Sequence, residues 1–172
     1  MTRLLYVTGV SCAGKTHLGR TLAEHPDADV TWDDIDIHAR ERPTTAWLNW
    51  LHWRAAELLV KADDLADTRH PPELVIVTGI SWPFRVIESP AWHQQSRLES
   101  VEWLLLDPPW KLVKARLNER LADKPKSDRR ETIDYNRSLR RTLRDQVESI
   151  KGGYVSTDPE AFMAVAKDLV GL

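Results

Sequence analysis

The sequence has a single cysteine, Cys12, among its 172 residues, so the chain cannot form an internal disulfide. It also has no apolar run near the roughly 20 residues that a membrane-spanning helix needs. The opening stretch MTRLLYVTG is too short for a secretory signal peptide. These absences favour a cytoplasmic protein without a membrane partner. No pattern in the sequence indicates an oligomeric state.

The composition is that of a globular protein, with 42% hydrophobic and 29% charged residues. The length suits one domain, which we expect to span residues 1–172. The net charge is only −2, but residues 111–151 hold 13 Lys and Arg against 7 Asp and Glu. Such a basic stretch either meets an anionic ligand on that side of the molecule or forms a solvated helix face.

Short apolar or β-branched runs alternate with helical patterns along the chain. The expected strands lie at 3–8, 28–32, 73–78, 101–106 and 153–157. Nearly continuous apolar strands that alternate with helices are typical of a parallel sheet covered on both faces. The sequence therefore predicts an α/β fold with a doubly wound, five-stranded parallel sheet.

Residues 44–62 predict one amphipathic helix between the second and third strands. At about 100° per residue, Trp50 lies at the margin of its apolar face and Trp53 projects away from it. Packing against a core therefore explains the residues of the apolar face, but it does not explain a tryptophan at position 53. The members of the apolar face are Trp47, Leu48, Leu51, Ala55, Leu58, Leu59 and Ala62.

The stretch GVSCAGKT, residues 9–16, directly follows the first expected strand. It fits the Gly-x-x-x-x-Gly-Lys-Thr pattern of a phosphate-binding loop, in which glycines let backbone N–H groups converge on a polyphosphate at a helix N-terminus. Lys15 would reach the β- and γ-phosphates of ATP, and the Thr16 hydroxyl would bind Mg²⁺. Cys12 is either a small residue that fits the loop or a thiol made reactive by the helix N-terminus. The other expected ATP-binding positions are Gly9, Ser11, Cys12, Ala13, Gly14 and His17.

Other classes of phosphate-loop protein fit the sequence less well. A GTPase would need a base-reading Asn-Lys-x-Asp motif, and the sequence contains no Asn-Lys pair. Large oligomeric ATPases and transporter ATPases need longer chains to hold their additional catalytic elements.

Three features together resemble the small P-loop kinases of the nucleoside-monophosphate-kinase superfamily. This group includes shikimate and gluconate kinases, chloramphenicol phosphotransferase and polynucleotide 5′-kinases. The features are the loop at 9–16, the acidic DDID at 33–36, and LLLDPPWKLVKARLNERL at 104–121, which leads into a basic segment. The resemblance spans most of the chain and implies a P-loop NTPase fold with a helical lid, and a kinase that uses ATP and Mg²⁺.

The resemblance gives the acidic cluster two alternative registers. Asp34-Ile-Asp36 resembles the Asp-x-Asp of shikimate kinases, which would place Asp34 in the metal shell and Asp36 on the substrate. Trp32-Asp33-Asp34-Ile35 equally resembles the acidic pair of polynucleotide kinases, in which the first acid is the base. Asp33 and Asp34 are both candidate catalytic acids, and the identity of the base stays open. A solvated acidic turn that caps the next helix is the structural alternative.

The resemblance also implies a lid, at about 122–131, that closes over the phosphates. Arg116 and Arg120 lie four residues apart on one side of the preceding expected helix. In the family such arginines pack near adenine or contact the β- and γ-phosphates. We expect Arg116 to bind the nucleotide, and Arg120 with Arg129 or Arg130 to stabilise the transferring phosphoryl group.

The stretch TGISWPFR, residues 78–85, lies where this family forms its acceptor pocket. Gly79 would let a ligand approach the backbone, Trp82 offers a stacking face or plugs the edge of the core, and Arg85 supplies positive charge. The sequence lacks the Gly-Gly-Gly run of shikimate kinases here and the Arg-rich substrate motif of adenylate kinases. Eight tryptophans favour an aromatic or nucleobase-containing acceptor, and further candidate contacts are Trp50 and Trp53.

We therefore predict a kinase that transfers the γ-phosphoryl group of ATP to a hydroxyl or phosphate on a small-molecule or nucleotide acceptor. A nucleic-acid hydroxyl is an alternative acceptor, which the negative net charge disfavours and the basic stretch keeps open. A non-catalytic, regulatory ATP-binding module is the alternative outside enzymes. The six histidines show no metal-ligand spacing.

Overall fold

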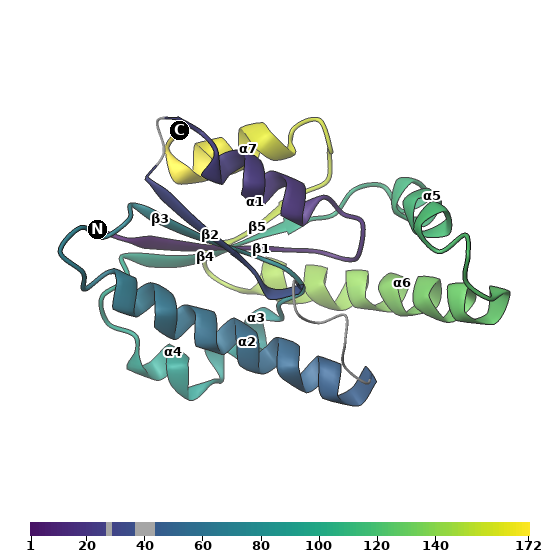
Figure 1. Ribbon diagram of the computed structural model, residues 1–172, viewed down its shortest axis with the longest axis horizontal. Coiled ribbons are helices and arrows are strands. Elements are labelled where there is room, and N and C mark those ends of the chain that lie inside the picture. Colours follow the sequence, from purple (N-terminus) through teal and green to yellow (C-terminus); the bar gives the residue numbers. More distant parts are fainter. Residues whose placement is uncertain (27–28, 37–43) are drawn as a thin grey trace.

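Five parallel strands form a sheet at the centre of the molecule (Figure 1). The computed structural model describes residues 1–26, 29–36 and 44–172, without the side chains of 44–47. The strand order is β2-β3-β1-β4-β5, and every neighbouring pair is parallel, as predicted. The strands are β1 at Arg3–Thr8, β2 at Val30–Asp34, β3 at Leu74–Thr78, β4 at Ser100–Leu106 and β5 at Gly153–Ser156.

The second strand ends later than the sequence indicated. The expected strand at 28–32 ends two residues too early, because β2 continues to Asp34 and pairs with β3 through Asp33–Val77 and Asp34–Thr78. These two acids are therefore strand residues and not part of a following turn. Because successive side chains of a strand point to opposite faces, they lie on different sides of the sheet.

Helices cover both faces of the sheet, as a doubly wound fold requires (Figure 1). One face carries α1 at Lys15–Ala23 and α7 at Phe162–Val170. None of the helices in the described ranges is both long and apolar enough to cross a membrane. The other face carries α2 at Thr44–Leu65, α3 at Pro83–Ile87, α4 at Pro90–Gln94 and α6 at Lys126–Ser149.

The central strands form the core because their side chains are apolar on both faces. All five residues of β3 are buried, as are the last five of β1. Tyr6 of β1 stacks on Trp103 of β4 with ring centroids 5.1 Å apart. The Tyr6 hydroxyl donates a hydrogen bond of 2.7 Å to the carbonyl of Ala55, which ties α2 to the sheet.

The α2 helix confirms the predicted amphipathic pattern and extends three residues beyond it, to Leu65. Trp53 is 58% exposed, as its position away from the apolar face predicts. Leu48 is half-buried, and the side chain of Trp47 lies outside the described residues. The buried members of the predicted face are Leu51, Ala55, Leu58, Leu59 and Ala62.

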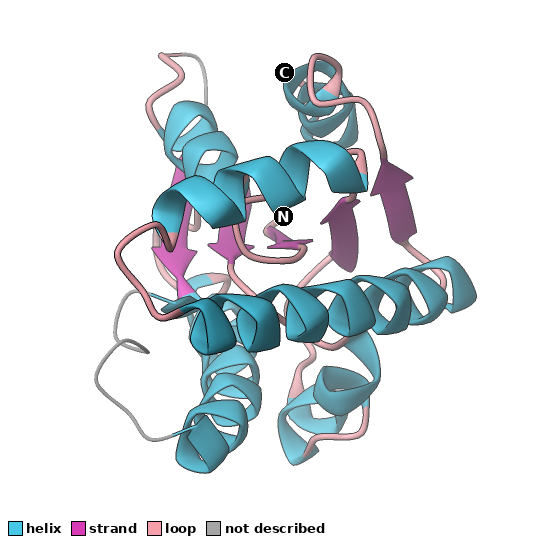
Figure 2. Cartoon of the chain, turned by 90° about the vertical axis from the view of Figure 1, so that its right-hand side faces the viewer, coloured by secondary structure: helices cyan, strands magenta, loops and turns pink. Residues whose placement is uncertain are grey.

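The segment expected as a lid, 122–131, is largely helical. A turn follows α5, at Trp110–Arg120, and α6 begins at Lys126 directly after Pro125. The proline ring favours this start because it fixes φ, here at −51°. α5 and the first part of α6 project beyond the carboxyl ends of the strands (Figure 1), and Figure 2 looks onto this end of the molecule.

Candidate active site

The loop between β1 and α1 has the backbone conformation of an anion-binding turn. Cys12 and Gly14 have left-handed φ values of 64° and 107°, which turns successive N–H groups toward one concave side. Gly9 is needed for a different reason, since a Cβ there would lie 2.7 Å from the carbonyl oxygen of Leu106. Lys15 is 6% exposed, and its ammonium donates a hydrogen bond of 3.0 Å to the Val10 carbonyl.

The hydroxyl of Thr16 meets the carboxylate of Asp34 beside this loop. Thr16 Oγ1 donates to Asp34 Oδ2 at 2.8 Å, and Asp34 Oδ1 accepts a 2.8 Å hydrogen bond from the backbone N–H of Asp36. A hydroxyl and a carboxylate are hard oxygen donors of the kind that Mg²⁺ takes together with phosphate oxygens and water. Within 1–26, 29–36 and 44–172, no group of three or more His, Cys, Asp or Glu side chains could hold a metal ion. Thr16 and Asp34 are the residues here that could contribute oxygen ligands to a Mg²⁺ ion.

Asp36 lies between the loop and the end of β3. Its Oδ1 accepts a long hydrogen bond of 3.5 Å from the backbone N–H of Ile80. Burial raises the pKa of Asp36, the positive charge of Lys15 lowers it, and the negative charge of Asp34 raises it. Burial in turn lowers the pKa of Lys15, and Asp36 and Asp34 oppose that effect. One ammonium and two carboxylates thus share a desolvated site.

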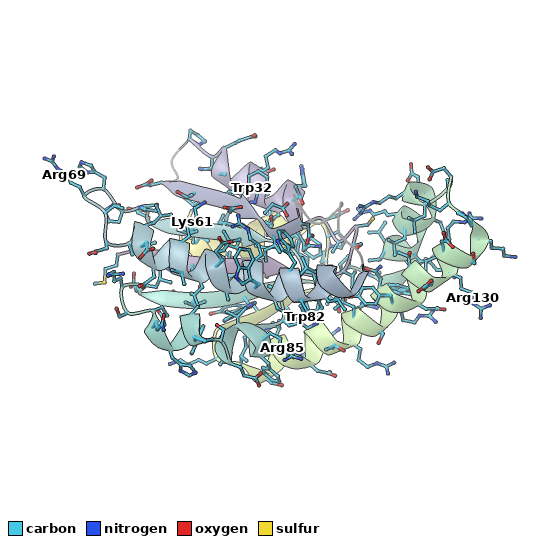
Figure 3. All side chains as sticks on the ribbon, turned by 60° about the horizontal axis from the view of Figure 1, so that its bottom comes forward. Trp32, Lys61, Arg69, Trp82, Arg85 and Arg130 are labelled. Atoms are coloured by element: carbon cyan, nitrogen blue, oxygen red, sulfur yellow. The ribbon has the colours of Figure 1, made fainter. Side chains whose placement is uncertain are left out.

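Asp33 faces the opposite side of the sheet, toward α2. Its carboxylate accepts from Lys61 Nζ at 2.8 Å and from Arg54 Nη2 at 3.4 Å. Figure 3 labels Lys61 on α2, and Arg54 also pairs with Glu57 at 2.5 Å. This placement follows from the strand alternation described above and argues against Asp33 as the base of a reaction at the loop.

Two arginines of α5 reach the phosphate loop. Arg116 Nη1 donates to the carbonyl oxygen of Cys12 at 3.1 Å, and Arg120 Nη1 lies 4.0 Å from the Cys12 sulfur. The charge of Arg120 also lowers the pKa of Lys15 and that of Asp36. The α5 helix, at Trp110–Arg120, therefore places both arginines beside the loop.

The α6 helix contributes a contact that the sequence did not reveal. Asn136 is 2% exposed, and its Oδ1 accepts a 2.9 Å hydrogen bond from the backbone N–H of Ser11. Its Nδ2 donates to the carbonyl of Thr132 at 2.8 Å. The one local signal was an uncharged amide at a core-facing position of a strongly basic helix.

The two candidate lid arginines point in different directions. Arg129 is seven residues before Asn136, so the two share a face of α6. It is half-buried, and its buried Nε has no hydrogen-bond partner in the described structure. Arg130 is 86% exposed and pairs with Asp134 on its own helix at 3.8 Å. Figure 3 shows Arg130 at the far end of α6, directed away from the sheet.

Other arginines of the basic stretch hold the fold together. Arg140 Nε donates to the buried carboxylate of Asp107, and Arg144 Nη1 donates to the same carboxylate at 3.0 Å. Arg137 lies over the ring of Trp110, 5.5 Å from its centroid. Part of the positive charge in residues 111–151 therefore binds the end of β4 and α5, and not a ligand.

Solved structures share the fold of this chain. No protein-family model and no curated protein matches the sequence. A shikimate kinase from Bacteroides thetaiotaomicron superposes with a TM-score of 0.60 at 19% identity, covering 99% of each chain. A sugar kinase from Janibacter sp. gives a TM-score of 0.57 at 19% identity, covering 99% of this chain and 95% of that one. A shikimate kinase from Acinetobacter baumannii, solved with shikimate, gives 0.52 at 20% identity, covering 99% and 92%. The chain therefore shares its fold with these kinases.

The predicted acceptor residues separate into two groups in the structure. Trp82 and Arg85 line one pocket of about 590 Å³ between α2, α3 and α6. Trp50 is half-buried against the core, and Trp53 is exposed; neither is among the residues that line the pocket. Figure 3 shows Trp82 and Arg85 in the region between α2 and α6.

Gly79 is explained by packing more directly than by ligand approach. Its φ is +137°, and a Cβ on it would lie 2.6 Å from Cβ of Ile35. The Asp36 carboxylate is the next neighbour, with Oδ1 at 3.4 Å from the same position. The glycine therefore lets the end of β2 pack closely onto the end of β3, which positions Asp36.

The remaining predicted residues of the phosphate loop differ in exposure, with Ala13 buried and His17 exposed on α1.

Proposed function

We propose that the protein is an ATP- and Mg²⁺-dependent kinase that transfers the γ-phosphoryl group to a hydroxyl or phosphate of a small or nucleobase-containing acceptor. The observation that carries the proposal is the juxtaposition of two acids with different partners. Asp34 pairs with the loop hydroxyl of Thr16 at 2.8 Å, and Asp36 stands beside Lys15 and the end of β3. Nucleotide binding alone has no need of the second carboxylate, whereas phosphoryl transfer to a hydroxyl does.

Each of these residues has a defined part in the proposed reaction. Lys15 and the loop N–H groups hold the β- and γ-phosphates. Thr16 and Asp34 would hold Mg²⁺, which neutralises phosphate charge. Asp36 orients the acceptor hydroxyl and accepts its proton. The acceptor oxygen forms a bond to the γ-phosphorus, the bond from that phosphorus to the β-phosphate oxygen breaks, and ADP leaves.

The arginines around the loop supply positive charge for the transferring group. Arg116 and Arg120 are held beside Cys12 by α5. Arg129 shares a face of α6 with Asn136, and its buried Nε has no hydrogen-bond partner in the described structure. Charge that is fixed in place before the reaction stabilises a transition state without further reorganisation.

The test is acceptor-dependent release of ADP. We expect at least one member of a panel of nucleosides, nucleotides, oligonucleotides and hydroxylated metabolites to accelerate ADP release. Lys15→Ala and Asp36→Asn should abolish the acceleration, while Lys151→Ala, which changes an exposed lysine in the turn before β5, should preserve it. Intact ATP binding with no acceleration by any acceptor would instead identify a non-catalytic ATP-binding module. An oligonucleotide acceptor would show binding that weakens steeply with salt.

A further inference from the structure

The pocket between α2, α3 and α6 has aromatic walls. Trp82 packs against His52 of α2 with ring centroids 4.6 Å apart and planes tilted by 58°. Phe84 is 42% exposed and Tyr135 is 38% exposed, and both line the same pocket. The backbone N–H of Phe84 donates to Gln146 Oε1 of α6 at 3.2 Å, which joins two walls of the pocket. Its volume of about 590 Å³ is in the range of small-molecule sites.

The charges that line this pocket balance. Arg85 of α3 supplies one positive charge, and Glu88, directly after α3, supplies one negative charge. Both side chains are exposed. His52 adds little, because burial and the nearby Arg85 lower its pKa and so favour the neutral imidazole. A site for a carboxylate would need a surplus of positive charge, which these residues do not provide.

Three arginines of the flanking helices are engaged elsewhere. Arg54 of α2 pairs with Asp33 and Glu57. Arg140 and Arg144 of α6 pair with Asp107. These arginines are therefore committed to structural ion pairs on the two helices that wall the pocket.

The pocket adjoins the proposed reaction centre. Ser81, directly before Trp82, exchanges hydrogen bonds with Thr8 at 3.0 and 3.1 Å, which fixes it to the residue that precedes the phosphate loop. Ile80, two residues before Trp82, contacts the carboxylate of Asp36. A molecule with its ring against Trp82 could thus extend a hydroxyl toward Asp36, at the carboxyl ends of the strands where α/β folds bind ligands.

We propose that this pocket binds a flat, uncharged aromatic or heteroaromatic ring of the phosphoryl acceptor, with the Trp82 indole as its main stacking surface. The proposal rests on the kinase activity proposed above and specifies the acceptor class. Hydroxyl-bearing ring compounds such as nucleosides or aromatic alcohols fit the pocket. Polyhydroxy carboxylates do not, although the fold is shared with shikimate kinases.

The experiment compares two sets of hydroxyl compounds. Adenosine, uridine and 2-phenylethanol carry a ring; shikimate, gluconate and glycerol carry none that is aromatic. Binding of each is measured by ligand-observed NMR without nucleotide, and acceleration of ADP release is measured with MgATP. We expect ring compounds to bind and at least one to accelerate ADP release, and we expect neither effect from the ring-free set.

Substitutions connect the effect to the pocket. Trp82→Ala should raise the KM for the best ring acceptor about tenfold without changing the Kd for ATP, and Trp82→Phe should restore most of the affinity. Phe84→Ala provides a second variant at a more exposed position, with an increase in KM in the same direction. Tyr154→Ala is the matched control, because Tyr154 is an aromatic side chain of β5 with a similar exposure of 40%.

The outcomes separate this inference from the activity on which it rests. Acceleration of ADP release by shikimate or gluconate, and not by ring compounds, overturns the inference and supports the kinase. Trp82-dependent binding of ring compounds with no acceleration by any acceptor supports the ring site and overturns the kinase. Absence of binding by all ring compounds, or an unchanged KM in both Trp82→Ala and Phe84→Ala, overturns the ring site.

Discussion

Asn136 of α6 accepts a 2.9 Å hydrogen bond from the backbone N–H of Ser11 in the phosphate loop, across 125 residues of sequence. The amide is 2% exposed and is itself held by the carbonyl of Thr132. The α6 helix and the phosphate loop are thereby joined through a buried polar contact. Its loss would leave a loop N–H without its partner and the loop free to move.

Asn136→Ala should lower the free energy of unfolding by about 1–3 kcal/mol, which is the cost of an unsatisfied buried polar group. It should also weaken ATP binding, because the loop is no longer held by α6. Chemical denaturation and calorimetric titration with MgATP measure the two effects. Asn118→Ala, at an exposed position of α5, is the control and should stay within about 0.5 kcal/mol of the original protein. Wild-type values for both quantities in Asn136→Ala would show that the contact does not organise the loop.

The second prediction separates the neighbouring acids of β2. Asp34→Asn should weaken the Mg²⁺-dependent gain in ATP affinity by about 10- to 100-fold, because its carboxylate meets the Thr16 hydroxyl. Asp33→Asn should preserve that gain, because Asp33 faces Lys61 and Arg54 on the other side of the sheet. The loss of these partly exposed ion pairs should cost at most about 1 kcal/mol of stability. ATP titrations with and without Mg²⁺ measure this gain in both variants. A gain that is lost in Asp33→Asn and kept in Asp34→Asn would assign the Mg²⁺ role to Asp33.

The phosphate loop and the layered fold could be predicted because their determinants are local. The phosphate-binding residues lie in one continuous stretch, which contains Gly9, Gly14, Lys15 and Thr16. The strands are recognisable from their apolar composition. The register of the acids could not be read in the same way. It depends on where β2 ends, and the pairing of Asp34 with Thr78 extends the strand past the last apolar residue, Trp32.

Contacts between distant segments were also hidden from the sequence. Asn136 occurs within a basic helix that reads as a solvated face, and its partner is in the phosphate loop. The tryptophans show the same limit. Trp32 donates its Nε1–H to the Thr78 hydroxyl at 3.0 Å, and Trp103 stacks on Tyr6, so both serve the fold. Trp82 is distinguished from them only by the pocket that α2, α3 and α6 form around it.

The third prediction concerns the conflict between stability and activity at Asp36. Burial raises its pKa, so the folded chain favours the neutral carboxyl. The stability gained by protonation is complete below the unfolded pKa and is lost as pH rises through the folded pKa. At neutral pH, Asp36→Asn should therefore raise the Tm, because it removes the unfavourable buried charge. It should lower turnover by about 100-fold or more, because the amide cannot accept the acceptor proton.

The pH profile of the unaltered protein provides an independent measure of Asp36. A base must be ionised, so kcat/KM should fall as pH drops through a pKa above the ordinary aspartate value of 3.8. Scanning calorimetry and initial rates across the pH range measure both effects. An Asp36→Asn variant that turns over normally would remove Asp36 from the reaction.

The fourth prediction compares one arginine of α5 with one arginine of α6. Arg120→Ala should lower kcat by about 100-fold or more, because it removes a positive charge fixed beside the loop. Arg130→Ala should leave kcat close to the original value, because Arg130 is 86% exposed and pairs only along its own helix in the described structure. Steady-state kinetics at saturating MgATP measure both variants. An equal loss of kcat in the two variants would contradict the prediction. It would mean that Arg130 comes close to the phosphate loop during the reaction, which it does not do in this structure.

The fifth prediction uses Cys12 as a reporter of nucleotide binding. It is the one cysteine of the chain and is partly exposed within the phosphate loop, so a maleimide reagent labels the protein at a single known position. A nucleotide held by the loop covers this thiol, and MgATP at 100 times its Kd should slow labelling about 100-fold. Mass spectrometry over time measures the rate, with Cys12→Ser as the unlabelled control that should retain ATP binding. Labelling at the same rate with and without MgATP would mean that the nucleotide does not occupy the loop, and it would remove the basis for the kinase proposal.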